Sequence, residues 1–161
     1  MSTPKVDVIV AEIIKLMKKR GLTLATAESI TGGGLAARIT DTKGSSAIFL
    51  GSIVSYSDAS KTKFLGIAKR VLTKSTSVSE VVASSMAESA RTQFAADYAI
   101  STTGVAGPGK AYGQKAGTVW IAIASKDKTV TVELALSGDR DAIRKATIES
   151  ALACLSRILT P

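Results

Sequence analysis

The most informative part of the sequence is the stretch Thr26-Ala27-Glu28-Ser29-Ile30-Thr31-Gly32-Gly33-Gly34, which indicates the fold class and holds the first candidate site. The residues before it, from Leu22 to Ala27, alternate apolar and polar side chains and predict a strand that ends at Glu28. A helix is expected after the three glycines, where apolar side chains have helical spacing at Leu35, Ala36 and Ile39. A strand that leads through a glycine-rich turn into a helix is typical of α/β proteins.

The turn carries a candidate nucleophile, Ser29, at the carboxyl end of the predicted strand. The glycines leave backbone N–H groups open to an anion or to a carbonyl oxygen. The chain has no histidine, so a Ser-His-Asp arrangement is excluded and Ser29 would need another base. The turn is neither a Walker A loop, since no lysine follows the glycines, nor a Gly-x-Ser-x-Gly elbow. Close packing is the alternative explanation for the glycines, and helix capping the alternative for Ser29.

Length and composition limit the class of protein. With 161 residues and 45% hydrophobic content, the chain predicts a single domain over residues 1–161. No apolar run reaches the roughly 20 residues that span a bilayer. The segment from Met1 to Lys5 lacks the apolar core of a signal peptide, so we expect a cytoplasmic protein without a membrane partner. The single cysteine, Cys154, excludes an internal disulfide and a cysteine-based metal site.

The net charge of +8 favours partners that carry phosphate. The basic residues are scattered, however, the aromatic content is 4%, and no DNA- or RNA-binding motif is present, which argues against nucleic acid as a partner. We therefore expect a small phosphorylated metabolite. A basic surface without a specific ligand is the alternative.

The remaining periodicities predict helices that alternate with about five strands. Helices are expected at residues 6–20, in a short basic segment around Lys61, from a capping box at Ser77 to Glu80 as far as Phe94, and at residues 140–159. Strands are expected at residues 49–57 and 98–103, and a hairpin at 118–124 and 129–136. This order predicts an α/β fold with a mixed sheet covered on both faces. The loop at residues 104–117, with five glycines and one proline, should border a site.

Several short motifs follow one another along the chain: Ala27-Glu28-Ser29-x-Thr31-Gly32-Gly33, Gly44-Ser45-Ser46 with Phe49, Tyr56-Ser57 with Lys61, Val78-Ser79, Thr103-Gly104-x-Ala106-Gly107-Pro108, Gly117-Thr118-Val119-Trp120, and Gly138-Asp139-Arg140 with Arg144. Together they resemble the competence-damage-inducible protein (CinA) C-terminal domain family. The resemblance spans almost the whole chain. It implies a three-layer α/β/α sandwich around a mixed sheet of about five strands.

The best-defined members of this family are nicotinamide mononucleotide deamidases. The resemblance therefore implies an amidohydrolase of pyridine nucleotide salvage that converts nicotinamide mononucleotide and water to nicotinate mononucleotide and ammonia. It implies Ser29 as the nucleophile and Lys61 as its base, with no metal and no cofactor. For this role the pKa of Lys61 must lie below its usual value, through burial or nearby positive charge. The oxyanion would form against backbone N–H groups of residues 31–33.

The resemblance also implies residues that bind the substrate around this pair. These are Glu28, Thr31, Gly32, Gly33, Tyr56, Thr103, Arg140 and Arg144. Arg140 and, one helical turn later, Arg144 would hold the substrate phosphate. Glu28 would either orient Lys61 or cap backbone N–H groups. Surface ion pairs are the alternative for the two arginines, and a solvated helix charge is the alternative for Lys61.

Two segments depart from the family pattern. Gly109-Lys110-Ala111-Tyr112 and Lys115-Ala116 stand where the family usually has Gly-Gly-Ser and Lys-Pro, and a Gly-Ala-Val-Ser segment appears as Thr76-Ser77-Val78-Ser79. Loops of this kind shape pockets, so these changes bear on substrate choice. A catalytically silent nucleotide-binding or regulatory module is the alternative function, and a nucleic-acid-associated protein a further one. Relatives commonly form homo-oligomers, and we expect the same here.

Overall fold

The structure is a computed structural model that describes residues 4–160. Its helices are α1 (Pro4–Arg20), α2 (Gly34–Thr40), α3 (Asp58–Leu65), α4 (Lys69–Ser75), α5 (Glu80–Gln93) and α6 (Arg140–Leu159), with a 3-10 turn η1 at Ser45–Ala47. Its strands are β1 (Leu24–Glu28), β2 (Phe49–Val54), β3 (Tyr98–Gly104), β4 (Thr118–Ala124) and β5 (Thr129–Ala135). The expectation about Met1 to Lys5 falls largely on residues 1–3, outside the described range.

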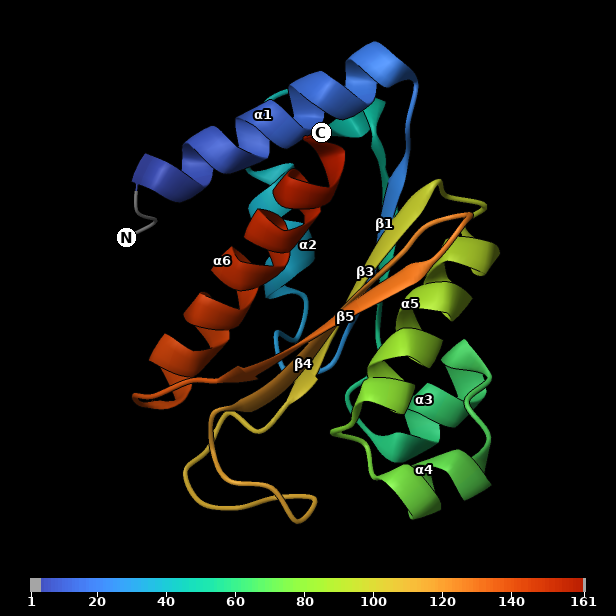
Figure 1. Cartoon of the computed structure of the whole chain (residues 1–161), viewed down its shortest axis with the longest axis vertical. Helices are drawn as coiled ribbons and strands as arrows, with labels where there is room; N and C mark the ends of the chain where they lie inside the picture. The colour runs from blue at the N-terminus through green and yellow to red at the C-terminus, as the bar shows by residue number, and fades with distance from the viewer. Residues whose placement is uncertain (1–3, 161) are drawn as a thin grey trace.

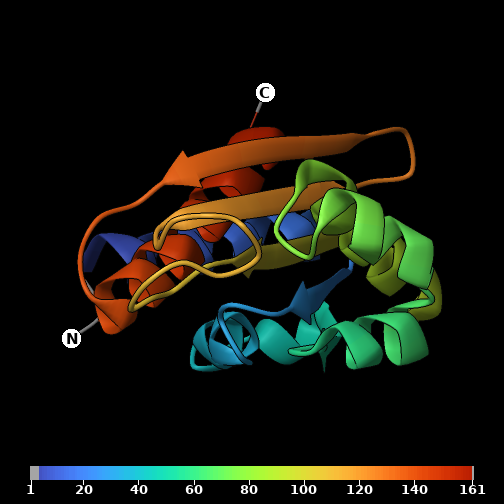
Figure 2. The same ribbon diagram turned by 90° about the horizontal axis from the view of Figure 1, so that it is seen from below.

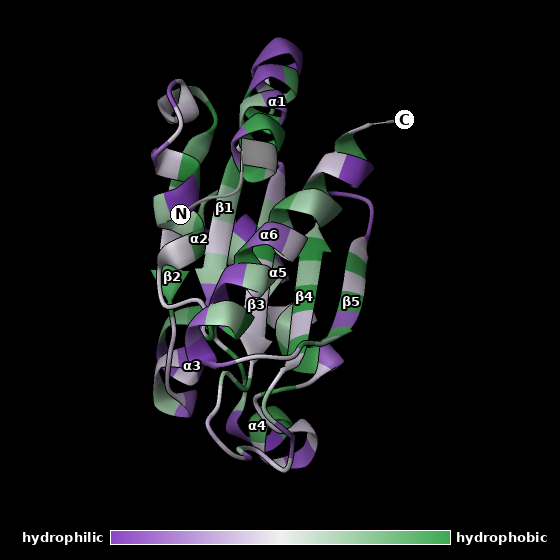
Figure 3. Cartoon of the chain, turned by 90° about the vertical axis from the view of Figure 1, so that its left-hand side faces the viewer, coloured by the Kyte–Doolittle hydropathy of each residue, from purple (hydrophilic) through white to green (hydrophobic). Residues whose placement is uncertain are grey.

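The five strands form one mixed sheet in the order β2-β1-β3-β4-β5. Figure 1 shows this sheet edge-on between two groups of helices, and Figure 3 shows the order of its strands. Strand β1 pairs in parallel with both β2 and β3. Strand β4 is antiparallel to β3 and to β5, and a tight hairpin joins β4 to β5. The predicted mixed sheet of about five strands is confirmed.

Helices cover both faces of this sheet, so the predicted α/β/α sandwich is confirmed (Figure 2). Helices α1, α2 and α6 pack on one face, against side chains such as Leu24 and Ile100. Helices α3, α4 and α5 pack on the other face, against small side chains such as Ala25 and Ala27. Strand β4 is largely hydrophobic, as burial on both faces requires (Figure 3). Within residues 4–160, none of the helices has the length and apolar character needed to cross a membrane.

The chain leaves β1 and β2 toward opposite faces of the sheet. After β1 it enters α2, which packs with α6, whereas after β2 it enters α3, which packs with α5. In open α/β sheets, ligands bind at the carboxyl ends of neighbouring parallel strands whose connections diverge in this way. The carboxyl ends of β1 and β2 therefore frame the candidate site.

Two local predictions differ from the structure. The N-cap of α5 is Ser79, whose hydroxyl accepts a hydrogen bond from the Val82 N–H, so the predicted capping box at Ser77 is wrong. Ser77 is buried and donates its hydroxyl hydrogen to Asp58 instead. Helix α4 was not predicted, because Leu72 is its one buried side chain and leaves no apolar periodicity to detect.

The predicted loop runs from Val105 to Gly117, since Gly104 still belongs to β3. Its two ends are joined: the Val105 N–H donates to the Thr118 carbonyl at 2.9 Å, and the Gly117 N–H donates to the Val105 carbonyl at 2.7 Å. Gly117 has a φ of 91°, and a Cβ there would lie 1.9 Å from the Leu136 carbonyl oxygen, so only glycine fits. The loop thus leaves and re-enters the sheet at a fixed base.

Candidate active site

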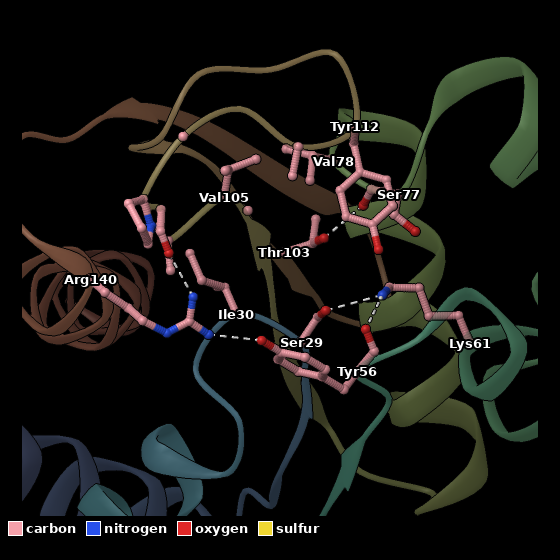
Figure 4. A pocket seen from close by; sticks show the side chains of 16 residues that line it. Ser29, Ile30, Tyr56, Lys61, Ser77, Val78, Thr103, Val105, Tyr112 and Arg140 are labelled. Carbon is pink, nitrogen blue, oxygen red and sulfur yellow. Dashed lines mark hydrogen bonds between the residues drawn. The ribbon is translucent and has the colours of Figure 1, made fainter.

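A serine and a lysine from different elements lie in hydrogen-bond contact at the carboxyl ends of β1 and β2. The Lys61 Nζ lies 3.0 Å from the Ser29 Oγ (Figure 4). Ser29 directly follows β1, and Lys61 is on α3, with only 1% of its surface exposed. The structure brings together the two residues that were predicted as nucleophile and base.

The surroundings of Lys61 favour its neutral form. Burial lowers the pKa of Lys61, because the ammonium ion is disfavoured away from water, and the Asp58 carboxylate partly opposes this effect. Apart from the Ser29 hydroxyl, the amine contacts the Tyr56 carbonyl oxygen at 3.5 Å, which is a weak hydrogen bond. A buried amine with a lowered pKa and one close hydroxyl partner is what a lysine base requires.

Glu28 precedes Ser29 in the chain, and consecutive side chains of a strand point to opposite faces. Its carboxylate lies at the start of α2 and accepts hydrogen bonds from the backbone N–H groups of Gly33, Leu35 and Ala36 at 3.0, 3.0 and 2.8 Å. Helix α2 has no side-chain cap from its own N-cap residue. Glu28 therefore caps α2 and does not orient Lys61, which resolves the alternative that the sequence left open.

This capping corrects the expected oxyanion site at residues 31–33. The Gly33 N–H donates to Glu28, and the Gly32 N–H donates to the Ser29 carbonyl at 3.1 Å, so neither group is open to a ligand. In the same turn, the N–H groups of Ile30 and Thr31 have no acceptor among residues 4–160. Ile30 also lines the cavity beside Ser29, so its N–H is the better candidate.

Five of the residues predicted for the site do not line the cavity: Glu28, Thr31, Gly32, Gly33 and Arg144. The Thr31 hydroxyl is buried and donates to the Glu28 carboxylate at 2.6 Å. The Arg144 guanidinium donates to the carbonyl oxygens of Ile30 and Thr31, at 3.2 and 2.9 Å. These contacts hold the turn that carries Ser29, the candidate nucleophile.

The other five lie in the lining of a cavity of about 150 Å³. They are Ser29, Tyr56, Lys61, Thr103 and Arg140. The remaining lining comes from Ile30, Ser77, Val78, the segment 104–109, Ala111 and Tyr112. Figure 4 shows Arg140 on one side of this cavity and Lys61 with Tyr112 on the other.

Tyr56 and Arg140 form the outer wall of the cavity. The Arg140 guanidinium donates to the Tyr56 hydroxyl at 2.9 Å and to the Gly107 carbonyl at 2.8 Å. Arg140 is the first residue of α6, and Tyr56 is 58% exposed. A positive charge is thus held at the mouth of the cavity.

The side of the cavity opposite Arg140 was only partly predicted from the sequence. Ser77 is buried in this wall, and its hydroxyl donates a hydrogen bond to the Asp58 carboxylate. The backbone carbonyl of Ser77 accepts a hydrogen bond from the Thr103 hydroxyl at 2.6 Å. Tyr112 reaches the cavity from the loop. Both Ser77 and Tyr112 lie in the two segments that depart from the family pattern. That departure was the one feature of the sequence that could have indicated them. Over residues 4–160, no three His, Cys, Asp or Glu side chains are grouped as metal ligands would be.

The chain matches known proteins over nearly its whole length. The model of the CinA C-terminal domain matches residues 6–159. The CinA-like protein of Frankia casuarinae is 42% identical over 153 residues, which are 95% of this chain and 35% of that protein. The CinA-like protein of Geobacter sulfurreducens is 41% identical over 162 residues, covering 95% of this chain and 39% of that protein. The chain therefore spans little more than a third of the length of these curated relatives.

Solved structures share the fold. The competence/damage inducible protein CihA from Agrobacterium tumefaciens has a TM-score of 0.94 and 31% identity, covering 100% of this chain and 99% of that chain. A competence-damaged protein (CinA) superfamily protein from Enterobacter cloacae has a TM-score of 0.94 and 32% identity, covering 99% of this chain and 95% of that chain.

Proposed function

The chain belongs to the CinA C-terminal domain family, and from this premise we propose that it hydrolyses the carboxamide of nicotinamide mononucleotide. The products are nicotinate mononucleotide and ammonia. The observation that carries this proposal is the 3.0 Å contact between the buried Lys61 amine and the Ser29 hydroxyl at the edge of a cavity. A serine is a weak nucleophile at neutral pH, and an adjacent neutral amine supplies the base it lacks.

In the first half of the reaction, Ser29 is acylated. Neutral Lys61 takes the hydroxyl proton of Ser29, and the Ser29 oxygen attacks the carboxamide carbon. The oxyanion accepts a hydrogen bond from the Ile30 N–H. Lys61 then gives its proton to the amide nitrogen, the carbon–nitrogen bond breaks, and ammonia leaves an ester on Ser29.

In the second half, water hydrolyses this ester. Lys61 takes a proton from the water molecule, and the resulting hydroxide attacks the ester carbonyl. The bond to the Ser29 oxygen breaks, and that oxygen takes the proton back from Lys61. Serine and neutral lysine are thereby restored.

Charge and cavity size support a nucleotide as the substrate. A cavity of about 150 Å³ has the size of one six-membered aromatic ring, so the pyridine carboxamide fits inside and the ribose phosphate lies outside. The Arg140 guanidinium at the mouth suits a phosphate, which it can bind with two hydrogen bonds. The proposal includes a homo-oligomer in the cytoplasm, where Cys154, a free thiol in the structure, stays reduced.

The test is ammonia release from nicotinamide mononucleotide by the purified protein. We expect Ser29→Ala to lower kcat at least about 1000-fold, because the covalent route is lost. The matched control is Ser85→Ala, which removes a hydroxyl on α5 outside the cavity lining and should retain activity. Turnover that survives Ser29→Ala would overturn the mechanism. Binding of the nucleotide without any turnover by the wild type would replace hydrolysis with the nucleotide-binding module.

A further inference from the structure

Tyr112 and Gly113 form the tip of a tight turn in the loop over the cavity. Ala111 and Gln114 exchange two backbone hydrogen bonds, at 3.1 and 2.9 Å. The φ angles of Tyr112 and Gly113 are 53° and 72°, so both central residues are left-handed, as in a type I′ turn. Asn, Asp or Gly usually occupies the first of these positions, and a bulky side chain there is an outlier.

This backbone conformation turns the Tyr112 ring toward the reacting pair. Tyr112 lines the cavity, and Figure 4 shows its hydroxyl end pointing toward the Lys61 amine. The side chain is 45% exposed, so part of the ring is covered by protein and part is open to a ligand. Strained positions of this kind concentrate at functional sites, and here the strained residue faces the candidate nucleophile and base.

The electrostatic surroundings of the ring suit a cation. Burial raises the pKa of Tyr112, and the Asp58 carboxylate and the Tyr56 phenol raise it further, so the phenol stays neutral at physiological pH. A neutral aromatic face attracts a positive charge through its quadrupole. The nicotinamide ring of nicotinamide mononucleotide carries a positive charge, because its ring nitrogen is bonded to the ribose.

The size of the cavity determines which part of the substrate Tyr112 can reach. The cavity holds about one aromatic ring, and Arg140 lies on the side opposite Tyr112. A ligand whose phosphate lies near Arg140 and whose carboxamide lies at Ser29 therefore presents its ring to Tyr112.

We propose that Tyr112 is a specificity-determining residue that contacts the cationic pyridine ring of the substrate and selects it over uncharged amides. The proposal rests on the proposed function, because it takes the ring to be that of nicotinamide mononucleotide. It goes beyond that function because it assigns recognition of the ring to a loop residue outside the Ser29–Lys61 pair.

Direct binding tests this proposal without turnover. Two ligands are titrated into Ser29→Ala protein: nicotinamide mononucleotide and its reduced form, which has the same ribose phosphate but an uncharged ring. We expect the oxidised form to bind about 10-fold more tightly, as a partly buried cation–π contact implies. Adding Tyr112→Leu should remove most of this difference, whereas adding Tyr112→Phe should retain it, because phenylalanine keeps the aromatic face.

In the active protein, Tyr112→Leu should raise KM for nicotinamide mononucleotide about 10-fold and change kcat less than about 3-fold. A Tyr112→Leu protein that keeps the preference for the oxidised form would overturn the proposal. A Tyr112→Phe protein that loses as much of this preference as Tyr112→Leu would also overturn it. The two proposals fail separately. A wild type that binds with the expected preference but releases no ammonia overturns only the hydrolysis, and a protein that binds neither ligand overturns both.

Discussion

The end of β1 and the first half of α3 each bury an ionisable side chain, Glu28 and Lys61, and the two side chains have very different surroundings. Glu28 accepts hydrogen bonds from the backbone N–H groups of Leu35 and Ala36 in α2, from that of the N-cap residue Gly33, and from the Thr31 hydroxyl, all within 3.0 Å. Lys61 has one close partner, the Ser29 hydroxyl at 3.0 Å, and a carbonyl at 3.5 Å. The two residues lie on opposite faces of the same corner of the sheet.

The difference separates a carboxylate with a structural role from an amine whose surroundings suit the proposed base. A buried carboxylate with a full set of donors holds its surroundings rigid and has no lone pair left for chemistry. A buried amine with few partners can exchange a proton with the one group it touches. Burial alone would not have distinguished them, since both side chains are 1% exposed or less.

Lys61→Met removes the proposed base, and among substitutions of these two buried residues it should change activity most. Activity should fall about 10³- to 10⁴-fold, because the base is lost. The free energy of unfolding should rise by about 1 kcal/mol, because methionine fills the buried position without a charge to desolvate. Ammonia release and urea denaturation measure the two effects, with Lys63→Met, an exposed lysine of α3, as the control.

The same variant has a pH dependence with a defined sign. The pKa of Lys61 is lowered in the folded state, so the unfolded state binds more protons between the folded value and the usual value of 10.5. Stability of the wild type therefore rises with pH through this window, and its deficit relative to Lys61→Met should shrink. A deficit that grows with pH would contradict the lowered pKa.

Glu28→Ala removes the carboxylate that caps α2. The variant leaves several buried donors of α2 unpaired, so the free energy of unfolding should fall by about 3 kcal/mol. Chemical denaturation measures this loss, and Glu12→Ala, at an exposed glutamate of α1, is the matched control. If Glu28→Ala were as stable as the control, the carboxylate would not be the cap that its distances indicate.

Arg144→Met tests whether the turn between Glu28 and Lys61 must be held in place. Loss of the contacts to the Ile30 and Thr31 carbonyls should let Ser29 shift and lower kcat about 10-fold, with KM changed less than about 3-fold. The phosphate role predicted from the sequence implies the reverse, a raised KM at constant kcat. Steady-state kinetics distinguish the two.

Asp58→Asn has the smallest expected effect. The Asp58 carboxylate raises the pKa of Lys61, so removing its charge should lower that pKa further. The rise of kcat/KM with pH, which follows deprotonation of Lys61, should then move to lower pH. Ser77→Ala keeps the carboxylate and should leave the profile nearer to that of the wild type. A shift of the Asp58→Asn profile to higher pH would exclude this coupling.

The sequence predicted the architecture because apolar periodicity records which face of each element is buried. The five residues that meet at the cavity were predicted through the resemblance to the family, which rests on ordered motifs along the chain; periodicity by itself placed Ser29 at the end of a strand. The sequence could not show that Glu28 and Arg144 lie behind the cavity. That separation depends on α2 and α3 leaving toward opposite faces, and a strand pattern does not say which face will carry a ligand.

Ser77 and Tyr112 illustrate a second limit. Neither belongs to a periodic segment, and both depend on contacts between residues far apart in the sequence. The Asp58–Ser77 hydrogen bond joins positions 19 residues apart. The place of the Tyr112 ring follows from a left-handed turn at a residue that rarely adopts one.

The hydrogen bonds that close the loop at residues 105, 117 and 118 bear on which loop sequences this fold can tolerate. Because Val105, Gly117 and Thr118 close the loop with backbone hydrogen bonds, the side chains between them can change without shifting the register of β3 and β4. We therefore expect the segment from residue 109 to 115 to tolerate sequence changes while the proposed Ser29–Lys61 pair keeps its position. Libraries randomised at positions 110, 111, 114 and 115, which leave the left-handed residues Gly109, Tyr112 and Gly113 unchanged, should yield folded proteins with altered ligand ranges.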